Sequence, residues 1–192
     1  MCASAPPVWR ASDHAASMIQ TRRLRLLPAR LSDFEAMGRG DEALGRSLGV
    51  AVANGWEGDP QHREAIASGD GFLADNPDAA GWWTYLFVLD AENLLIGVGG
   101  LKGRPQAGAA EIGYALAPEH RGRGLALEAA RGLMQFAFTS PVVEVVRAHT
   151  LAEENASTRL LRRLGLQQAG AVHDPDEGDI WRWEITREQA LN

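Results

Sequence analysis

Apolar and polar residues alternate along one stretch of this chain, and elsewhere apolar residues occur in short runs or recur every three to four positions. Alternation with a period of two is typical of a half-buried strand, and it occurs at 21–29 (TRRLRLLPA). Apolar runs bounded by turn residues predict further strands at 82–90, 94–103, 110–117, 142–150, 166–172 and 179–185. The pattern therefore predicts a sheet of about seven strands.

Four other segments have features of helices. One apolar face has helical spacing and consists of Ala126, Ala129, Ala130, Leu133, Met134 and Ala137. Further helices are predicted over 31–40, 60–76 and 155–165. In the first of these, Ser32 and Glu35 have the spacing of a capping box.

The predicted elements follow the order β-α-α-β-β-β-α-β-α-β-β. One strand–helix–strand crossover in a sheet otherwise joined by hairpins predicts an α/β (α+β) fold, with about seven strands in a mixed sheet and about four flanking helices. A chain of 192 residues can form one domain with a sizeable core. We predict a single domain over 21–192 and a flexible arm over 1–20, whose residues are mainly small or polar.

Composition excludes several classes of protein. The net charge of -6 argues against a nucleic-acid binder, and no apolar run approaches the roughly 20 residues that span a bilayer. The single cysteine, Cys2, excludes an internal disulfide framework and a cysteine-rich metal site, and it fits a cytoplasmic location. No metal site is visible. Residues 31–100 carry twelve Asp and Glu but three Arg, whereas 101–170 carry nine Lys and Arg and six Glu.

A strand, a glycine-containing loop and a helix follow one another around 117–129 (APEHRGRGLALEA). The first N–H groups of a helix lack internal partners and bind anions well. Gly122 and Gly124 remove side chains that would block those N–H groups, while Arg121 and Arg123 add positive charge. Taken alone, the stretch fits either an ordinary turn or a phosphate-binding loop, and the acidic net charge argues against an arginine patch for nucleic acid.

The segment "LAPEHRGRGLALEA" resembles the acyl-CoA pyrophosphate loop of the GNAT superfamily of N-acetyltransferases, whose signature is [QR]-x-x-G-x-[GA]. Arg121, Gly124 and Ala126 match that signature. The strand "AEIGYAL" before it and "ENASTRLLRRLGL" after the next strand also resemble the family. The resemblance extends from about Thr21 to Ile185. Within the superfamily, the sequences of these segments are similar to those of the branch of ribosomal-protein N-terminal (serine/alanine) acetyltransferases.

This resemblance implies acetyl-CoA as acyl donor and a bound pyrophosphate. The main-chain amides of the loop would hold it, namely those of Arg121, Gly122, Arg123, Gly124, Leu125 and Ala126. It also implies that the strand ending at Leu116 separates from the next strand, so that the N–H near Leu116 polarises the thioester carbonyl. Asn155 is expected to contact coenzyme A, although Glu154 occupies the position where the branch carries its Asn.

Two residues are predicted to be catalytic. Glu111 starts a central strand where several family members place a base; a solvated strand-end Glu is the alternative, and His149 is the second candidate base. Ser157 is the candidate proton donor, with helix N-cap as its alternative role. Many family members carry a Tyr in the helix over 155–165, but this chain has Leu161 there, which excludes a phenolic proton donor from that helix.

The resemblance implies an enzyme that acetylates a primary amine by direct attack in a ternary complex. The acidic residues of the first helices favour a cationic acceptor, such as a peptide N-terminus, a polyamine or an amino-sugar, with Trp56, Trp82 and Trp83 as either pocket or core residues. The alternative is a non-catalytic acyl-CoA sensor or interaction module. No nucleic acid, membrane or metal partner is expected, and the chain is either a monomer or a homodimer.

Overall fold

A computed structural model describes residues 17–57, 66, 69–76, 79, 81–175 and 178–191. The strands are β1 (Ile19–Gln20), β2 (Leu24–Pro28), β3 (Ala51–Val52), β4 (Thr84–Leu89), β5 (Leu94–Leu101), β6 (Ala109–Leu116), β7 (Val145–Leu151), β8 (Gln167–Asp174) and β9 (Gly178–Thr186). The helices are α1 (Leu31–Gly38), α2 (Asp41–Leu48), α4 (Gly69–Asp75), α5 (Leu125–Thr139), α6 (Ala156–Leu164) and α7 (Arg187–Leu191). Two short 3₁₀ turns are η3 (Asp90–Glu92) and η4 (Pro118–His120).

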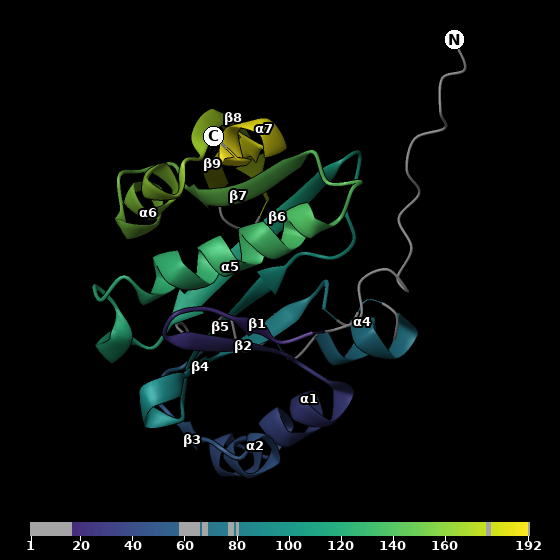
Figure 1. Ribbon diagram of the computed structural model, residues 1–192, viewed down its shortest axis with the longest axis vertical. Coiled ribbons are helices and arrows are strands. Elements are labelled where there is room, and N and C mark those ends of the chain that lie inside the picture. The colour runs from purple at the N-terminus through teal and green to yellow at the C-terminus, as the bar shows by residue number, and fades with distance from the viewer. Residues whose placement is uncertain are drawn as a thin grey trace.

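The strands form one mixed sheet in the order β1-β2-β4-β5-β6-β7-β9-β8, with β3 paired to β5 (Figure 1). β6 and β7 run parallel, as do β3 and β5, and the other neighbours are antiparallel. The helix α5 makes the crossover between the parallel pair β6 and β7. The mixed α/β fold expected from the sequence is therefore confirmed.

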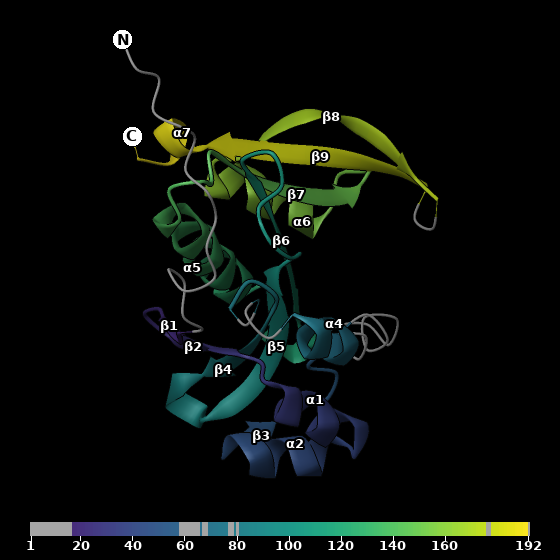
Figure 2. The ribbon, with the colours of Figure 1, turned by 90° about the vertical axis from the view of Figure 1, so that its right-hand side faces the viewer.

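Helices cover both faces of the sheet. Figure 2 shows α5 on one side of the central strands and α1 and α4 on the other. One core cluster joins α5 and α6 to residues of β4, β6, β7 and β9, and a second joins α1, α2 and α4 to the opposite face of β4 and β5. Strand residues alternate between these clusters because successive side chains point to opposite faces.

The parallel strands β6 and β7 pair over only part of their length. Their register runs from Ala109 opposite Val145 to Glu111 opposite Arg147 and continues no further. Beyond that point β6 pairs with β5 alone, through Leu116 opposite Gly97. The two strands therefore diverge toward the N-terminal end of α5 (Figure 1), as the resemblance implied.

Several local predictions differ from the structure. Of the arm predicted over 1–20, residues 1–16, including Cys2, lie outside the described part, whereas Ile19 and Gln20 form β1 against β2. The helix over 31–40 is capped at Arg30 instead of Ser32, because the Asp33 carboxylate accepts the Arg30 backbone N–H at 2.9 Å. The described part of the predicted helix over 60–76 contains α4.

Sequence patterning did not reveal α2, β3 or α7. Gly45 lies inside α2 and weakens its helical signal, since glycine is a poor helix former. Any larger residue at position 45 would clash with the backbone, because a Cβ there would lie 2.8 Å from the Val50 carbonyl oxygen. The two-residue strand β3 and the five-residue helix α7 are too short to show a periodicity.

Candidate functional site

The loop before α5 has the backbone of an anion-binding site. Gly122 and Gly124 adopt left-handed conformations, with φ of 72° and 75°. Gly124 is the N-cap of α5 and no side chain caps that helix end among the described residues. A Cβ at Gly122 would meet nothing within 4 Å. The first N–H groups of this 15-residue helix are therefore available to an anion, so the loop fits the pyrophosphate of coenzyme A.

Hydrogen bonds from Thr21 and Arg23 connect the segment before β2 to this loop and to the first turn of α5. Glu128, in the first turn of α5, accepts hydrogen bonds from the Thr21 hydroxyl at 2.7 Å and from the Arg23 backbone N–H at 2.6 Å. Arg23 also bonds Glu128 through Nε at 2.7 Å and donates to the Arg123 carbonyl at 3.1 Å. Partial burial raises the pKa of Glu128, but these hydrogen bonds and the Arg23 charge leave it below its ordinary value. Sequence reasoning missed this contact, which joins residues about a hundred positions apart.

Arg121, one of the two predicted loop arginines, contacts the end of β6. Arg121 Nε donates to the Leu116 carbonyl at 3.0 Å, so this side chain holds the end of β6. The Ala117 N–H donates to Ile96 on β5 at 2.8 Å. Because backbone groups alternate along a strand, the N–H and C=O of Leu116 point the other way, toward the gap between β6 and β7. This is the orientation that the oxyanion role requires.

Glu111 lies at the point where β6 and β7 separate. Its Oε1 is 3.0 Å from His149 Nδ1 and 2.7 Å from Lys102 Nζ. Both candidate bases therefore occupy one site, and Lys102, which sequence reasoning missed, joins them. Its position directly before the turn of 103–108 carries no pattern that would single it out.

The environment of Glu111 favours its charged form. Partial burial raises the pKa of this carboxyl, but the hydrogen bonds and charges of Lys102 and His149 outweigh burial and leave the pKa below its ordinary value of 4.5. A carboxylate stabilised in this way is a weaker proton acceptor than a free one. Glu111 is thus well suited to hold the His149 imidazole in one orientation.

The start of α6 separates the roles expected of Asn155 and Ser157. Asn155 is the N-cap: its side chain accepts the Thr158 N–H at 3.0 Å, and the Thr158 hydroxyl accepts the Asn155 N–H at 3.0 Å. Ser157 is therefore not the cap, and its side chain lies near that of Tyr114, whose pKa burial raises to about 12. Glu154 is exposed and pairs with Arg162.

The candidate groups lie on two faces of the sheet. Tyr114 and Leu116 on β6 face the core cluster under α5 and α6, so Glu111 on the same strand faces the opposite side. His149 also lies on that side, because its neighbour Ala148 belongs to the α5 cluster. Glu111 and His149 thus lie on the face of the sheet opposite the core cluster that Tyr114 and Leu116 join.

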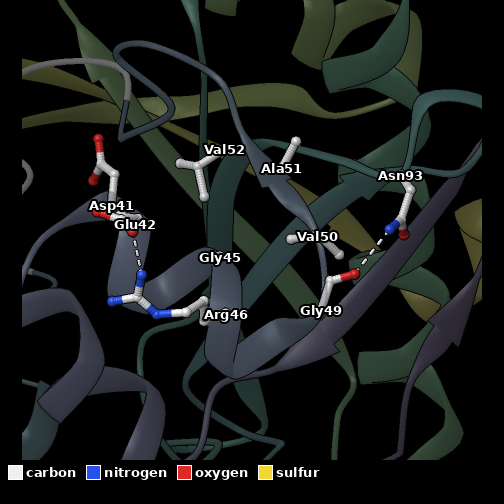
Figure 3. Close-up of a pocket in the computed structure, with 9 residues that line it drawn as sticks. All are labelled: Asp41, Glu42, Gly45, Arg46, Gly49, Val50, Ala51, Val52 and Asn93. Carbon is white, nitrogen blue, oxygen red and sulfur yellow. Dashed lines mark hydrogen bonds and ion pairs between the residues drawn. The ribbon is translucent and has the colours of Figure 1, made fainter.

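Many acidic side chains of the first helices have partners within the protein. Asp33 accepts from Ser47 Oγ at 3.1 Å, and Asp41 accepts from Trp56 Nε1 at 3.2 Å. A surface pocket of about 520 Å³ lies beside α2 and β3, and Figure 3 shows Glu42 paired with Arg46 on its wall. None of the predicted catalytic or coenzyme residues lines this pocket.

The tryptophans expected in the pocket or the core lie mainly in the core. Trp56 and Trp82 are buried. Trp83 is half-buried and stacks on Phe72, with ring centroids 4.2 Å apart. In the second half of the chain, Leu161 is fully buried where many family members carry the phenolic residue.

The described part of the chain contains neither a cluster of metal ligands nor a helix that could span a membrane. Its His, Cys, Asp and Glu side chains form no group of three or more that could hold a metal ion. None of its helices is both long enough and apolar enough to cross a bilayer.

Comparison with known proteins gives the same picture. Residues 23–167 match the family described as Acetyltransferase (GNAT) domain. The uncharacterised N-acetyltransferase YjdG of Bacillus subtilis is 27% identical over 149 residues, which is 77% of this chain and 88% of that protein.

Solved structures share the fold at lower identity. The ribosomal-protein-S5-alanine acetyltransferase of Vibrio fischeri superposes with a TM-score of 0.64 at 15% identity, covering 90% of this chain and 97% of its own. Mycobacterium smegmatis RimJ, solved in complex with CoA-disulfide, superposes with a TM-score of 0.63 at 22% identity, covering 93% and 91%. With the family match over most of its length, this chain belongs to the GNAT acetyltransferases.

Proposed function

We propose that this acetyltransferase uses acetyl-CoA to acetylate the α-amine at the N-terminus of a peptide or protein, by direct attack in a ternary complex. The observation that carries the proposal is the cluster of Glu111 and His149 where β6 and β7 separate. Acetyl-CoA supplies the acetyl group as an activated thioester. The chain must then bind the donor, polarise the carbonyl, accept a proton from the amine and return one to the sulfur.

Donor binding falls to the loop before α5. The amides from Gly122 to Ala126 would hold the pyrophosphate, with the left-handed Gly122 and Gly124 giving it access. The Arg121 N–H, expected from the sequence to join them, donates instead to the Pro118 carbonyl at 3.2 Å. The pantetheine would enter the gap between β6 and β7. There the Leu116 N–H, held in orientation by Arg121, would donate to the developing oxyanion.

Proton acceptance falls to His149, with Glu111 as its orienting partner. The Glu111 carboxylate accepts from His149 Nδ1–H, so His149 Nε2 carries the lone pair that takes the amine's proton. The free-energy cost of deprotonation depends on the acceptor amine. Deprotonating an α-amine of pKa about 8 at pH 7 costs about 1.4 kcal/mol, whereas a lysine side chain near 10.4 costs about 4.6 kcal/mol. The site therefore favours an α-amine over a lysine.

A panel of acceptors tests the substrate. Acetyl-CoA is incubated with a lysine-free peptide, the same peptide with a blocked N-terminus and one lysine, spermidine, and glucosamine, while thiol release and product mass are followed. We expect the highest kcat/KM for the free α-amine. Equal or faster turnover of the blocked lysine peptide, spermidine or glucosamine would refute this acceptor. Binding of CoA without turnover of any amine would favour a sensor.

Matched variants test the catalytic pair. Glu111→Gln and His149→Asn should each lower kcat at least tenfold while leaving the Kd for CoA nearly unchanged. Glu184→Gln is the control, since Glu184 on β9 also lies between two cations, 2.8 Å from Arg147 Nε and 3.3 Å from Arg182 Nε. If Glu184→Gln lowers kcat as much as Glu111→Gln, the assignment of Glu111 and His149 is wrong.

A further inference from the structure

Glu128 places a negative charge close to the proposed pyrophosphate site. It lies in the first turn of α5, the helix whose N-terminus would hold that anion. A carboxylate there repels a second anion, and the repulsion is stronger where water is excluded. The Glu128 side chain is only 17% exposed. The loop therefore needs a group that neutralises this carboxylate.

Arg23 supplies the compensating charge. Its Nε lies 2.7 Å from Glu128 Oε2, and its backbone N–H donates to Glu128 Oε1 at 2.6 Å. The Thr21 hydroxyl donates to the same oxygen at 2.7 Å. This segment comes close to α5 because Gly132, one turn after Glu128, has no side chain: a Cβ there would lie 3.1 Å from Thr21 Cγ2. The Glu128 carboxylate is thus both neutralised and fixed in place.

The same guanidinium also holds the backbone of the loop. Arg23 Nη1 donates to the Arg123 carbonyl at 3.1 Å. The C=O and the following N–H of a planar trans peptide point in opposite directions, so the Gly124 N–H is directed away from Arg23. That N–H has no hydrogen-bond partner in the part of the chain that the structure describes. Arg23 therefore fixes the direction of an N–H that is available to an anion.

We propose that Arg23 is a positioning residue for the acyl donor: its guanidinium neutralises Glu128 and turns the Gly124 N–H toward the pyrophosphate of coenzyme A. This inference rests on the proposed function, which places the pyrophosphate at this loop. The planar guanidinium reaches both groups at once, because Nε bonds the Glu128 carboxylate and Nη1 bonds the Arg123 carbonyl. A lysine has the same charge but one nitrogen, which cannot occupy both positions.

Calorimetric titration with CoA tests the role of Arg23, because it needs no amine acceptor. Arg23→Met should raise the Kd for CoA at least tenfold. Arg23→Lys should raise it at least threefold, since lysine keeps the charge but has only one nitrogen. If Arg23→Lys binds CoA as tightly as the wild type does, charge alone is sufficient, the contact with the Arg123 carbonyl positions nothing, and the proposal fails.

A second substitution tests the neutralisation of Glu128. The double variant Arg23→Met/Glu128→Gln should bind CoA at least threefold more tightly than Arg23→Met alone, because the uncompensated carboxylate is gone. A general loss of packing would not be relieved by removing another side chain from the same network. If the double variant binds CoA no more tightly than Arg23→Met, Arg23 does not act by neutralising Glu128.

Arg25→Met is the matched control. Arg25 lies two residues further along the chain on β2, and its Nε forms an ion pair with Asp90 Oδ1 at 2.6 Å. Its side chain is 28% exposed, compared with 36% for Arg23. Arg25→Met therefore removes the same charge and a similar ion pair, and it should leave the Kd for CoA within twofold. An equal rise in Kd in both variants would overturn the proposal.

The amide resonance of Gly124 gives a readout that a loss of stability alone would not change. In ¹H–¹⁵N spectra of the wild type and of Arg25→Met, saturating CoA should move the Gly124 amide proton downfield, because that N–H gains a hydrogen bond to phosphate. In Arg23→Met this shift should be absent. If it persists there, the N–H reaches the anion without Arg23 and the inference is wrong. If the wild type binds CoA without this shift, the proposed donor loop is itself wrong, whichever amine the enzyme acetylates.

Discussion

Replacing Gly124 by valine tests the anion-binding loop most directly. Gly124 is the N-cap of α5 and has a φ of 75°, a region that a β-branched residue rarely occupies. From the sequence alone, Gly124→Val is expected to abolish CoA binding and leave the fold intact. The structure adds a cost to folding of about 1–3 kcal/mol for the strained backbone. For a chain of this length, that cost lowers the melting temperature by about 2–12 °C.

The loss of CoA affinity has a separate cause. A valine at the N-cap places methyl groups where the pyrophosphate approaches the helix amides. Losing one charge-assisted hydrogen bond costs about 1.5–3 kcal/mol. That energy corresponds to a rise in Kd of about tenfold to more than a hundredfold.

Gly49→Val separates these two effects. Gly49 ends α2 with a φ of 68°, and a Cβ there would meet nothing within 4 Å. The backbone strain therefore matches that at Gly124, whereas the site lies on α2, away from the loop before α5. Melting curves measure stability, and calorimetric titration with CoA measures affinity. If Gly124→Val binds CoA as tightly as Gly49→Val does, the loop does not hold the pyrophosphate.

Three further predictions follow from other contacts. Gly97→Ala should lower the free energy of unfolding by about 1–3 kcal/mol in a urea titration, and it should also lower kcat. The reason is that its Cβ would lie 2.4 Å from the Ala115 carbonyl oxygen and 2.5 Å from the Leu116 side chain. Unchanged stability and kcat would contradict this close contact. The lowered pKa of Glu111 means that its ion pair stabilises the fold above about pH 4.5 and is lost as the pH falls through that pKa, so the stability difference between wild type and Glu111→Gln should shrink on acidification. A difference that grows would show the opposite sign. Asn155→Ala should cost about 1 kcal/mol and Asn155→Asp much less if the side chain acts only as a cap, with CoA affinity unchanged in both; weaker CoA binding by both would restore the contact expected from the sequence.

Local patterns predicted most of the fold because they depend on neighbouring residues. Alternation and apolar runs located the longer strands, and helical spacing located α5. Predictions of helix starts were less accurate. Ser32 and Asp33 are adjacent and both suit an N-terminal turn, and the choice depends on which backbone N–H is left unpaired after β2 joins the sheet.

In the candidate site, too, the sequence predicted the residues of a continuous motif and missed contacts made between separate elements. The signature formed by Arg121, Gly124 and Ala126 is continuous in the chain, so sequence alone identified the loop and the family. Lys102 was not found because only the pairing of β5 with β6 brings it beside Glu111. The network that Arg23 makes with the loop was not found because its contacts join residues about a hundred positions apart.

The sequence by itself determined the order of the longer elements and, through the resemblance of its loop, the family and the acyl donor, because a glycine loop at a helix N-terminus is a continuous local pattern. Only the tertiary structure decided which side chains meet where β6 and β7 separate. Glu111 and His149 come together on one face of the sheet because the parallel pairing of β6 and β7 aligns their side chains on the side opposite the α5 cluster. Which side chains share a face of this gap therefore depends on strand register, which no local pattern of residues specifies.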